Sequence, residues 1–341
     1  MSGRTLVVRS DNFGDVLLTG PAVRAVAAQA ESVVMLAGPR GAAAAHLLPG
    51  VDQVVEHCLP WIDPEPPAAH RAEMEALVDR IAALQVSNAL IFTSFHQSPL
   101  PLALLLRMAG VEWIGAISED YPGSLLDLRH RTTGDPPEPE RALSLARAAG
   151  YSLPAGDDGS LAVRTPLPEV DHLLPGRGYV VVHPGASVPA RQYPADKCAD
   201  VVELLARRGH RVVVTGSAAE QQLAKHVAGS DGVNLGGKTT LAELAAVLSK
   251  ASVVVAPNTG PAHLAAAVGT PVVSLFAPVV PAARWAPYGV PTAVLGDQRA
   301  PCKDTRARAC PVAGHPCLSS VDPVEVADAA DRIRRGASCG S

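Results

Sequence analysis

The chain of 341 residues has few aromatic side chains and no long apolar run. Phe, Trp and Tyr make up 4% of the residues, whereas Ala, Val and Leu are abundant. This composition argues against an aromatic-lined β-sandwich and favours thin buried strands covered by Ala-rich helices. The most apolar stretch, residues 99–108, contains Pro101 and Arg107 and falls short of the roughly 20 residues that span a bilayer. We therefore expect an α/β protein without a transmembrane segment.

Common cofactor motifs and an export signal are also missing. No G-x-G-x-x-G follows the first apolar run at residues 6–9, and no G-x-x-x-x-G-K-[ST] occurs. The sequence therefore predicts neither a dinucleotide oxidoreductase of the usual fingerprint nor a P-loop enzyme. The first residues lack the charged segment and long apolar core of a secretory signal, so we expect a cytoplasmic protein.

Cysteine is scarce, with six residues that are too scattered for a disulfide scaffold in a chain of this length. Three of them, Cys302, Cys310 and Cys317, lie near one another in sequence, and His315 precedes the last. Their spacing fits none of the common C-x2-C zinc patterns. A structural zinc, a disulfide and free thiols in an ordered loop remain as alternatives.

The apolar pattern predicts two domains of alternating strands and helices. The chain exceeds what one core usually organises, and short β-branched runs alternate with Ala/Leu-rich segments, as in parallel sheets. A stretch rich in Pro, Gly and Asp interrupts this pattern at residues 150–178. We expect Rossmann-like domains at residues 1–165 and 166–321 that face a ligand-binding cleft, and a C-terminal helix and tail at residues 322–341.

Individual elements follow from the same periodicity. The expected strands lie at residues 6–9, 33–36, 51–56, 89–93, 113–117, 179–182, 211–215, 253–256 and 272–275. The expected helices lie at residues 16–30, 71–84, 100–108, 140–149, 196–208, 220–227, 241–249, 262–268 and 322–334.

The first strand leads directly into a polar segment that contains Asp15. Ligands of open parallel sheets bind beyond the carboxyl ends of the strands, so Asp15 should lie at the mouth of the cleft. A carboxylate in that place can serve as a base. It can equally cap the following helix by accepting backbone N–H bonds, and both interpretations stay open.

The loop after the expected strand at residues 179–182 has the chemistry of a phosphate site. Small residues up to Ser187 allow backbone N–H groups to approach an anion, and the guanidinium of Arg191 suits phosphate oxygens. The alternative is a surface turn with a solvated arginine.

A second anion site is predicted after the strand at residues 253–256. Asn258, Thr259 and Gly260 form a polar turn, and Pro261 opens a helix whose N-terminal N–H groups and dipole favour a diphosphate. His263 lies in the first turn of that helix, either as a donor to phosphate or as a packing residue.

Taken together, these segments resemble glycosyltransferase family 9, the heptosyltransferases. The resemblance rests on motifs whose order and spacing cover nearly the whole chain. They are G-D-V at 14–16 with Thr19 and Pro21, P-G-A-S at 184–187 with R-Q-Y-P at 191–194, T-G at 215–216 with Glu220, N-T-G at 258–260 with His263, and L-F at 275–276 through R-W at 284–285 to P-Y-G at 287–289.

The resemblance implies an inverting glycosyltransferase of the GT-B type, with the acceptor on the first domain and a nucleotide sugar, typically ADP-heptose, on the second. Asp15 matches the catalytic base, Arg191 a lysine that holds the donor phosphates, and Glu220 a carboxylate at the ribose. The other donor residues implied are Ser187, Thr215, Asn258, Thr259, Gly260 and His263. The residues implied on the acceptor side are Asn12, Gly14, His96 and Gln97. No D-x-D occurs, so we expect no divalent metal and no other cofactor.

Asn258 departs from the family pattern, because relatives usually carry Asp before Thr-Gly, where it contacts the donor sugar. An amide can still hydrogen-bond a hydroxyl in both directions. The change therefore favours an altered sugar preference over lost activity.

The acceptor is predicted from charge. Residues 1–165 contain 12 Arg and no Lys against 19 Asp and Glu, a net charge of −7, whereas the remainder carries +3. An acidic domain attracts cations and repels phosphorylated lipid, so we expect a small neutral or cationic acceptor such as a natural-product aminocyclitol. The alternatives are transfer to lipopolysaccharide or another cell-surface glycan, a nucleotide-sugar epimerase or phosphorylase, and a binding module that holds the donor without turnover. We expect no nucleic-acid partner, and a monomer or weak homodimer.

Overall fold

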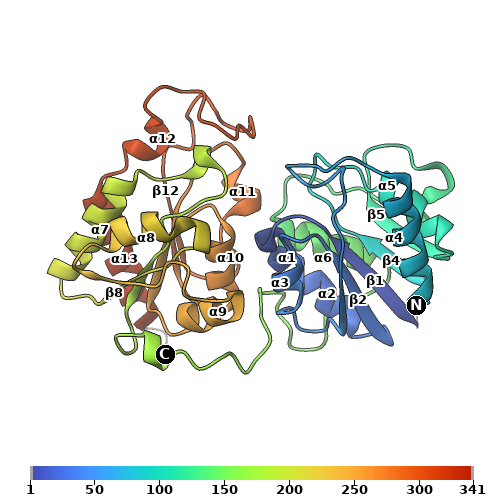
Figure 1. The fold of residues 1–341 in the computed structure, drawn as a ribbon, viewed down its shortest axis with the longest axis horizontal. Coiled ribbons are helices and arrows are strands. Elements are labelled where there is room, and N and C mark those ends of the chain that lie inside the picture. Colours follow the sequence, from blue (N-terminus) through green and yellow to red (C-terminus); the bar gives the residue numbers. More distant parts are fainter. Residues whose placement is uncertain (1–2, 339–341) are drawn as a thin grey trace. The chain divides into compact units, whose positions relative to one another are not determined.

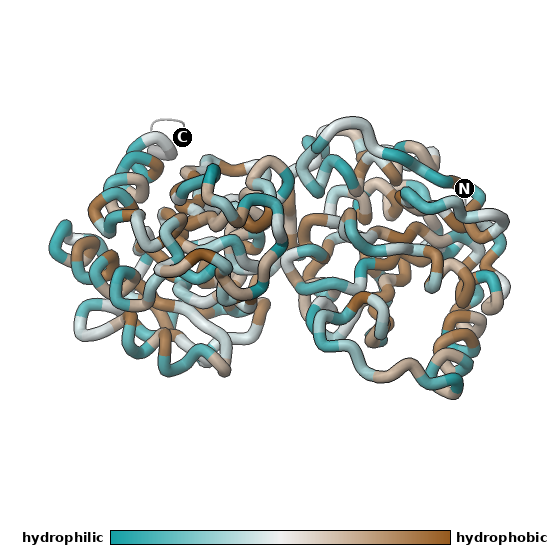
Figure 2. The backbone as a smooth tube through the Cα atoms, turned by 90° about the horizontal axis from the view of Figure 1, so that it is seen from above, coloured by the Kyte–Doolittle hydropathy of each residue, from teal (hydrophilic) through white to brown (hydrophobic). Residues whose placement is uncertain are grey.

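The computed structural model describes residues 3–338, which form two α/β units (Figure 1). One unit ends at Arg164 and the other begins at Thr165. Each contains one parallel sheet of six strands, and apolar segments run through the middle of each unit in Figure 2. The predicted α/β class with two Rossmann-like sheets is confirmed. Every helix in residues 3–338 is too short or too polar to span a bilayer.

The sheet of the first unit has the strand order β3-β2-β1-β4-β5-β6. Its strands are β1 (Arg4–Arg9), β2 (Ser32–Ala37), β3 (Gln53–Glu56), β4 (Asn88–Ile91), β5 (Trp113–Ile117) and β6 (Leu128–His130). Its helices are α1 (Phe13–Leu18), α2 (Gly20–Ala27), α3 (Ala42–Ala45), α4 (Arg71–Ala83), α5 (Leu100–Met108), α6 (Glu138–Ala148) and the 3-10 helix η1 (Gly123–Leu125).

The central strands of this sheet are apolar because both faces are covered. Leu6 and Val8 of β1 pack with Ile81 of α4 and Leu102 of α5 in one buried cluster. Val7, which points to the opposite face, is also fully buried. A strand buried on both sides needs a continuous apolar run, and this explains why β1, β2 and β4 could be recognised in the sequence.

The second sheet repeats the same topology, with the order β12-β11-β10-β7-β8-β9. Its strands are β7 (Val180–Val182), β8 (Val212–Val214), β9 (Gly232–Asn234), β10 (Val253–Pro257), β11 (Val272–Leu275) and β12 (Thr292–Leu295). Its helices are α7 (Ala195–Arg207), α8 (Gln221–Ala228), α9 (Leu241–Ser249), α10 (Gly260–Ala267), α11 (Ala282–Trp285), α12 (Pro316–Ser319) and α13 (Pro323–Ser338), with 3-10 helices η2 (Asp171–Leu173), η3 (Pro189–Arg191) and η4 (Ala218–Glu220).

The C-terminal helix belongs to the core of this second unit. Val326 and Ala330 of α13 join the buried cluster formed by α7, α8 and the strands. The backbone N–H of Val324 donates to the Asp322 carboxylate at 2.8 Å, so Asp322 accepts from the first turn as its sequence context predicts. Residues 339–341 of the expected tail lie outside the described part of the chain.

The prediction of one helix over residues 16–30 is wrong. The structure has α1 and α2, separated at Thr19. Pro21 has no N–H to donate to the carbonyl of Leu17, so the α-helical ladder cannot continue through it. At the break, the Thr19 hydroxyl donates to the Asp15 carbonyl at 3.0 Å.

Three strands were not predicted, and all three lie at sheet edges. They are β6, β9 and β12. Each has only three or four residues and no fully buried run, because an edge strand is covered less completely than a central one.

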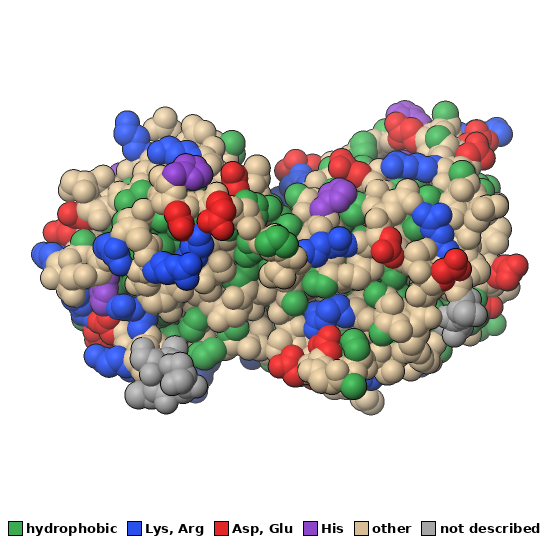
Figure 3. Space-filling model, turned by 90° about the horizontal axis from the view of Figure 1, so that it is seen from below, with side chains coloured by type: hydrophobic (Ala, Val, Ile, Leu, Met, Phe, Trp, Pro, Cys, Tyr) green, Lys and Arg blue, Asp and Glu red, His purple; other side chains and the backbone are tan. Residues whose placement is uncertain are grey.

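On the face drawn in Figure 3, acidic and basic side chains are interspersed over both units.

Candidate active site

The first unit has its topological switch point between β1 and β4. The connection from β1 runs to β2 on one side, and β4 pairs with β1 on the other, so the carboxyl ends of β1 and β4 open a crevice. The segments that follow these two strands are residues 10–15 and 92–97. They carry all the residues that the sequence predicts on the acceptor side.

Asp15 is the third residue of α1, and its side chain is 18% exposed. Its carboxylate Oδ1 lies 3.2 Å from Nη2 of Arg9, the last residue of β1. The position before the helix belongs to Asn12, which is exposed, and Gly14 is buried inside the helix. The structure therefore gives Asp15 an ion pair with the sheet, and Asn12 occupies the cap position.

Arg9 is the centre of a buried cluster of charged groups that the sequence did not predict. Its side chain is 2% exposed, and its Nε lies 2.8 Å from Oδ2 of Asp11. Its Nη1 lies 3.7 Å from Oε2 of Glu138, and its Nη2 donates to the Ser94 hydroxyl at 3.0 Å. Burial opposes the charge on Arg9, but Asp11, Asp15 and Glu138 outweigh burial and raise the pKa of Arg9 above its ordinary value.

A second arginine completes this cluster from α6. Nη1 of Arg141 lies 3.6 Å from Oε2 of Glu138 and donates to the Thr93 carbonyl at 2.7 Å. Burial lowers the pKa of Arg141, and the nearby Glu138 acts in the opposite direction. The cluster thus connects the start of α6 to the ends of β1 and β4.

Gln97 joins the cluster from the loop after β4. The Gln97 amide donates to Asp11 and accepts from the backbone N–H of Ser94 at 2.8 Å. His96 is exposed and meets the ring of Phe95 edge to face, with ring centroids 5.7 Å apart.

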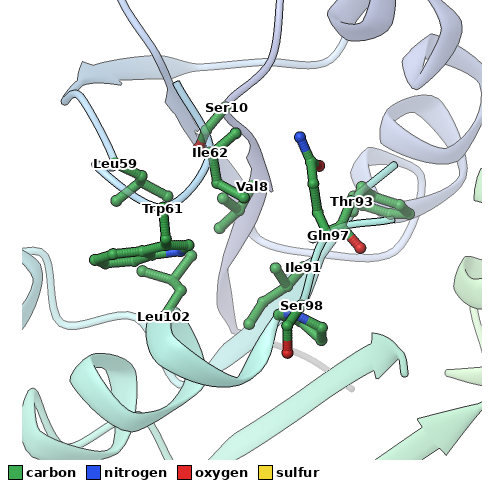
Figure 4. Close-up of a pocket in the computed structure, with 12 residues that line it drawn as sticks. Val8, Ser10, Leu59, Trp61, Ile62, Ile91, Thr93, Gln97, Ser98 and Leu102 are labelled. Carbon is green, nitrogen blue, oxygen red and sulfur yellow. The ribbon is translucent and has the colours of Figure 1, made fainter. Parts of the chain in front are cut away.

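A small, mostly apolar hollow lies beside Gln97 at the same end of the sheet. Figure 4 shows Leu59 and Trp61 on one side of this hollow, with Thr93 and Gln97 across from them. Val8 of β1 and Ser10 are among its lining residues, so the hollow lies at the carboxyl end of β1, the end that carries Arg9.

The second unit has its switch point between β7 and β10, where the predicted donor residues gather. His183 follows β7 and is buried, with Nδ1 3.0 Å from the Thr215 hydroxyl and Nε2 3.9 Å from Oε2 of Glu220. Burial lowers the pKa of His183 to about 4, although Glu220 acts in the opposite direction. The histidine is therefore neutral at physiological pH.

Glu220 has two structural contacts in addition to its predicted ribose contact. Its Oε2 accepts from the N–H and the hydroxyl of Ser217, both at 2.8 Å. A Cβ at Gly185 would lie 2.0 Å from its Oε1, so a side chain at this position would require the Glu220 carboxylate to move. These contacts fix the carboxylate beside the loop that follows β7.

His263 and Asn258 present buried polar atoms at the other side of this switch point. Each residue is about 5% exposed or less, and Nδ1 of His263 and Nδ2 of Asn258 have no hydrogen-bond partner within residues 3–338. Burial lowers the pKa of His263 to about 4, and the charge of Arg191 adds to this effect. Arg191 at the end of η3 is therefore close enough to act electrostatically on His263.

The remaining donor candidates surround the same strand ends. Thr259 precedes α10 and Gly260 is its first residue, so the helix begins one residue before the predicted Pro261, and its N-terminus lies just beyond the carboxyl end of β10. Ser187 is exposed in the loop between β7 and η3.

The three clustered cysteines are free thiols. Cys302 and Cys317 are buried in the core of the second unit, and Cys310 is half-buried. Burial, followed by the neighbouring Cys302 and Cys310, raises the pKa of Cys317 to about 11. No group of three or more His, Cys, Asp or Glu with a metal-binding arrangement occurs within residues 3–338.

Sequence reasoning missed Arg9, Asp11, Glu138 and Arg141 in the first unit and His183 in the second. Arg9 and His183 share a recognisable signal, because each is a titratable residue directly at the end of a buried β-branched strand. Glu138 and Arg141 carry no such signal, since only the fold brings α6 to the end of β1.

Comparisons with known proteins identify the family and the fold. Residues 100–314 match the model of glycosyltransferase family 9 (heptosyltransferase). Lipopolysaccharide heptosyltransferase 3 of Escherichia coli is 35% identical over 114 residues, which cover 32% of this chain and 34% of that protein. Lipopolysaccharide heptosyltransferase 1 of Salmonella typhimurium is 26% identical over 82% of this chain and 89% of its own length. The match with the E. coli relative thus spans about a third of that protein.

Solved structures share both units. The ADP-heptose lps heptosyltransferase II of E. coli superposes with a TM-score of 0.75 at 18% identity, over 98% of this chain and 99% of that chain. An iron-containing dodecameric glycosyltransferase from enterotoxigenic E. coli matches with a TM-score of 0.56 at 15% identity, over 99% and 80% of the two chains. These likenesses confirm the expected two-domain fold of the GT-B type.

Proposed function

Because the chain belongs to glycosyltransferase family 9, we propose that it transfers a heptose from ADP-heptose to a hydroxyl group of a glycan acceptor of the lipopolysaccharide type. One observation carries this proposal: the polar groups at the β7–β10 switch point, including the buried Asn258 and His263, lie within the residues that match the family. The acceptor class follows the names of the relatives, which are lipopolysaccharide heptosyltransferases.

The proposed mechanism is a single displacement with inversion. Asp15 removes the proton of the acceptor hydroxyl while its oxygen bonds to the anomeric carbon, and the bond from that carbon to the diphosphate oxygen breaks. The electron pair of that bond leaves with ADP. Arg191 and the N–H groups at the start of α10 stabilise the charge on the departing diphosphate, so the mechanism needs no divalent ion.

The role of Asp15 is tested by Asp15→Asn in the purified protein. The substitution keeps a hydrogen-bonding side chain of the same size but removes its basicity, so we expect turnover of ADP-heptose to fall by about 10²-fold or more with little change in Tm. Asp52→Asn is the matched control, because the Asp52 carboxylate accepts the Val33 N–H at 2.7 Å just before β3, at the opposite end of the same sheet. Near-normal transfer by Asp15→Asn would restrict Asp15 to a structural role.

The identity of the donor sugar is tested at Asn258. The buried Nδ2 group of Asn258 has no partner in residues 3–338, so its counterpart must come from a bound ligand or water. Asn258→Asp restores the usual residue of the family. We expect the variant to raise kcat/KM for ADP-heptose relative to other ADP-sugars by about 10-fold or more, as for a hydrogen bond to a charged group. An unchanged ratio would show that residue 258 does not select the sugar.

A second acceptor class is supported by charge. The first unit is acidic, and its Arg9 and Arg141 are committed to buried carboxylates. A small cationic acceptor therefore remains the competing proposal. Transfer of heptose to amino-sugar acceptors, with none to a phosphorylated lipopolysaccharide core, would favour it.

A further inference from the structure

The buried cluster around Arg9 bears directly on the base of the proposed reaction. We propose that Arg9 is a positioning residue that fixes the Asp15 carboxylate for proton removal, and that Glu138 and Arg141 fix Arg9 in turn. This inference rests on the proposed function, because it concerns the base of that reaction.

Arg9 reaches Asp15 from a rigid part of the sheet. It is the last residue of β1, which is paired on both sides, with β2 and with β4. Asp15 lies instead in a helix of six residues that ends at Thr19. A side chain on such a short helix acquires a defined orientation when a group anchored in the sheet holds it.

The guanidinium of Arg9 is itself held from several directions. Asp11 lies at Nε, Glu138 at Nη1, and Ser94 lies with Asp15 at Nη2. The planar fork of an arginine can satisfy these groups together in one orientation only. Rotation of Arg9 away from Asp15 would leave a carboxylate buried without its cation, which is strongly unfavourable.

The composition of the cluster points beyond a stabilising role. Three carboxylates share two arginines, and Oε1 of the 2%-exposed Glu138 has no hydrogen-bond partner within residues 3–338. Buried charges are costly, and an apolar set of similar volume would often stabilise a fold equally well. Such a cost at the end of a strand, beside a candidate base, is typical of a functional site.

The titratable and charged groups that face Arg9 come from two elements. Asp11 and Asp15 approach from the β1–α1 segment, and Glu138 and Arg141 from α6. The neutral Ser94 and Gln97 approach from the loop after β4. His130 of β6 and Glu119 act on Arg141 rather than on Arg9 directly.

The test is the pH dependence of kcat/KM for heptose transfer by full-length Arg9→Met. An arginine beside a carboxyl lowers the pKa of that carboxyl by about 1–3 units, so its removal should move the acid limb of the profile upward by about 1 pH unit or more. We expect kcat at neutral pH to fall by about 10²-fold as the base loses its position, with KM for the donor unchanged.

Arg24→Met is the matched control. Arg24 lies in α2 of the same unit and is 13% exposed. It forms its ion pair with Asp157, at 2.6 Å, and not with a residue of the Arg9 cluster. This variant should lose stability but keep the parental pH profile. A profile of Arg9→Met that overlaps the profile of Arg24→Met would overturn the positioning role.

Arg9→Lys keeps the inference testable if Arg9→Met fails to fold. One ammonium group retains the charge but cannot reach all the carboxylates as a fork, so we expect an unmoved acid limb and a kcat about tenfold lower. Parental turnover by Arg9→Lys would contradict the inference. Absence of transfer by the parent protein would contradict the proposed function itself, so the two failures are distinguishable.

Discussion

At the scale of single residues, a buried histidine of the second unit makes the free energy of unfolding depend on pH. His263 is buried and its pKa is about 4, because burial and the charge of Arg191 disfavour the imidazolium. An unfolded histidine titrates near pH 6.5. Between these two values the unfolded chain binds a proton that the folded chain does not, so the free energy of unfolding falls as the pH falls.

This linkage is measurable in His263→Asn by urea unfolding at pH 7 and pH 4.5. The experiment covers the two pH units from 6.5 to 4.5, which correspond to about 2–3 kcal/mol, so the variant should lose about that much less stability than the parent on acidification. His226→Asn is the control, because His226 is 53% exposed on the same unit. An equal loss in His263→Asn and the parent would show that His263 is protonated in the folded protein.

The same scale shows what the sequence could and could not reveal about the site. Arg191, Asn258 and His263 follow strands or open a helix, and their chemistry can be recognised locally. The partners of Arg9 cannot be recognised in this way. Glu138 precedes Arg141 on a helix far along the chain, and only the packing of α6 against the first sheet turns this pair into neighbours of Asp15.

At the scale of elements, the loop of residues 183–191, which we propose binds the donor phosphates, is fixed by a segment far from it in sequence. The Ala190 N–H donates to the Arg308 carbonyl at 2.9 Å, and Nε2 of His315 lies 3.0 Å from the Ala190 carbonyl. The backbone N–H and carbonyl of Ala190, the residue of η3 before Arg191, are therefore both hydrogen-bonded to the loop after β12. This arrangement explains how a short 3-10 helix can present an arginine in a defined position.

The proposed binding of the donor phosphates by this loop is tested with Arg191→Ala. Loss of a charge-assisted hydrogen bond should weaken ADP binding by about 1.5–3 kcal/mol, whereas adenosine, which has no phosphate, should bind the variant and the parent alike. Calorimetric titration measures both ligands. Arg177→Ala, at an exposed position of the same unit, should leave both affinities unchanged. Equal losses for ADP and adenosine would show that Arg191 does not contact phosphate.

The strands that the sequence predicted best are the ones buried on both faces. The central strands β1, β7 and β10 are continuous apolar runs, because helices cover both faces of each sheet. The edge strands have no such run and were missed. The break between α1 and α2 depends on Pro21, whose effect on the ladder outweighs the helical periodicity around it.

At the scale of the whole molecule, charge distinguishes the two halves of the sequence. Residues 1–165 carry a net charge of −7 and the remainder +3. The basic second half, to which we assign the donor, suits a nucleotide diphosphate. The acidic half bears on the acceptor, because a net field steers ions of opposite sign and repels those of the same sign.

The change of the acceptor KM with ionic strength therefore tests whether the net charge of the first unit acts on the acceptor. Exposed charges are screened over about 10 Å at 0.1 M salt. If the net charge of the first unit governs the encounter, KM for a phosphorylated lipopolysaccharide core should fall several-fold as ionic strength rises, and KM for an aminocyclitol should rise.

The opposing explanation is a local basic patch at residues 129–131. The Arg129 guanidinium donates to the Ser118 and Glu119 carbonyls, so mainly the exposed Arg131 remains for such a patch. Steady-state kinetics of the parent and of Arg131→Gln decide between the two explanations. A KM for the phosphorylated core that rises with salt in the parent, and no longer does so in Arg131→Gln, would show that the local patch outweighs the acidic field of the unit.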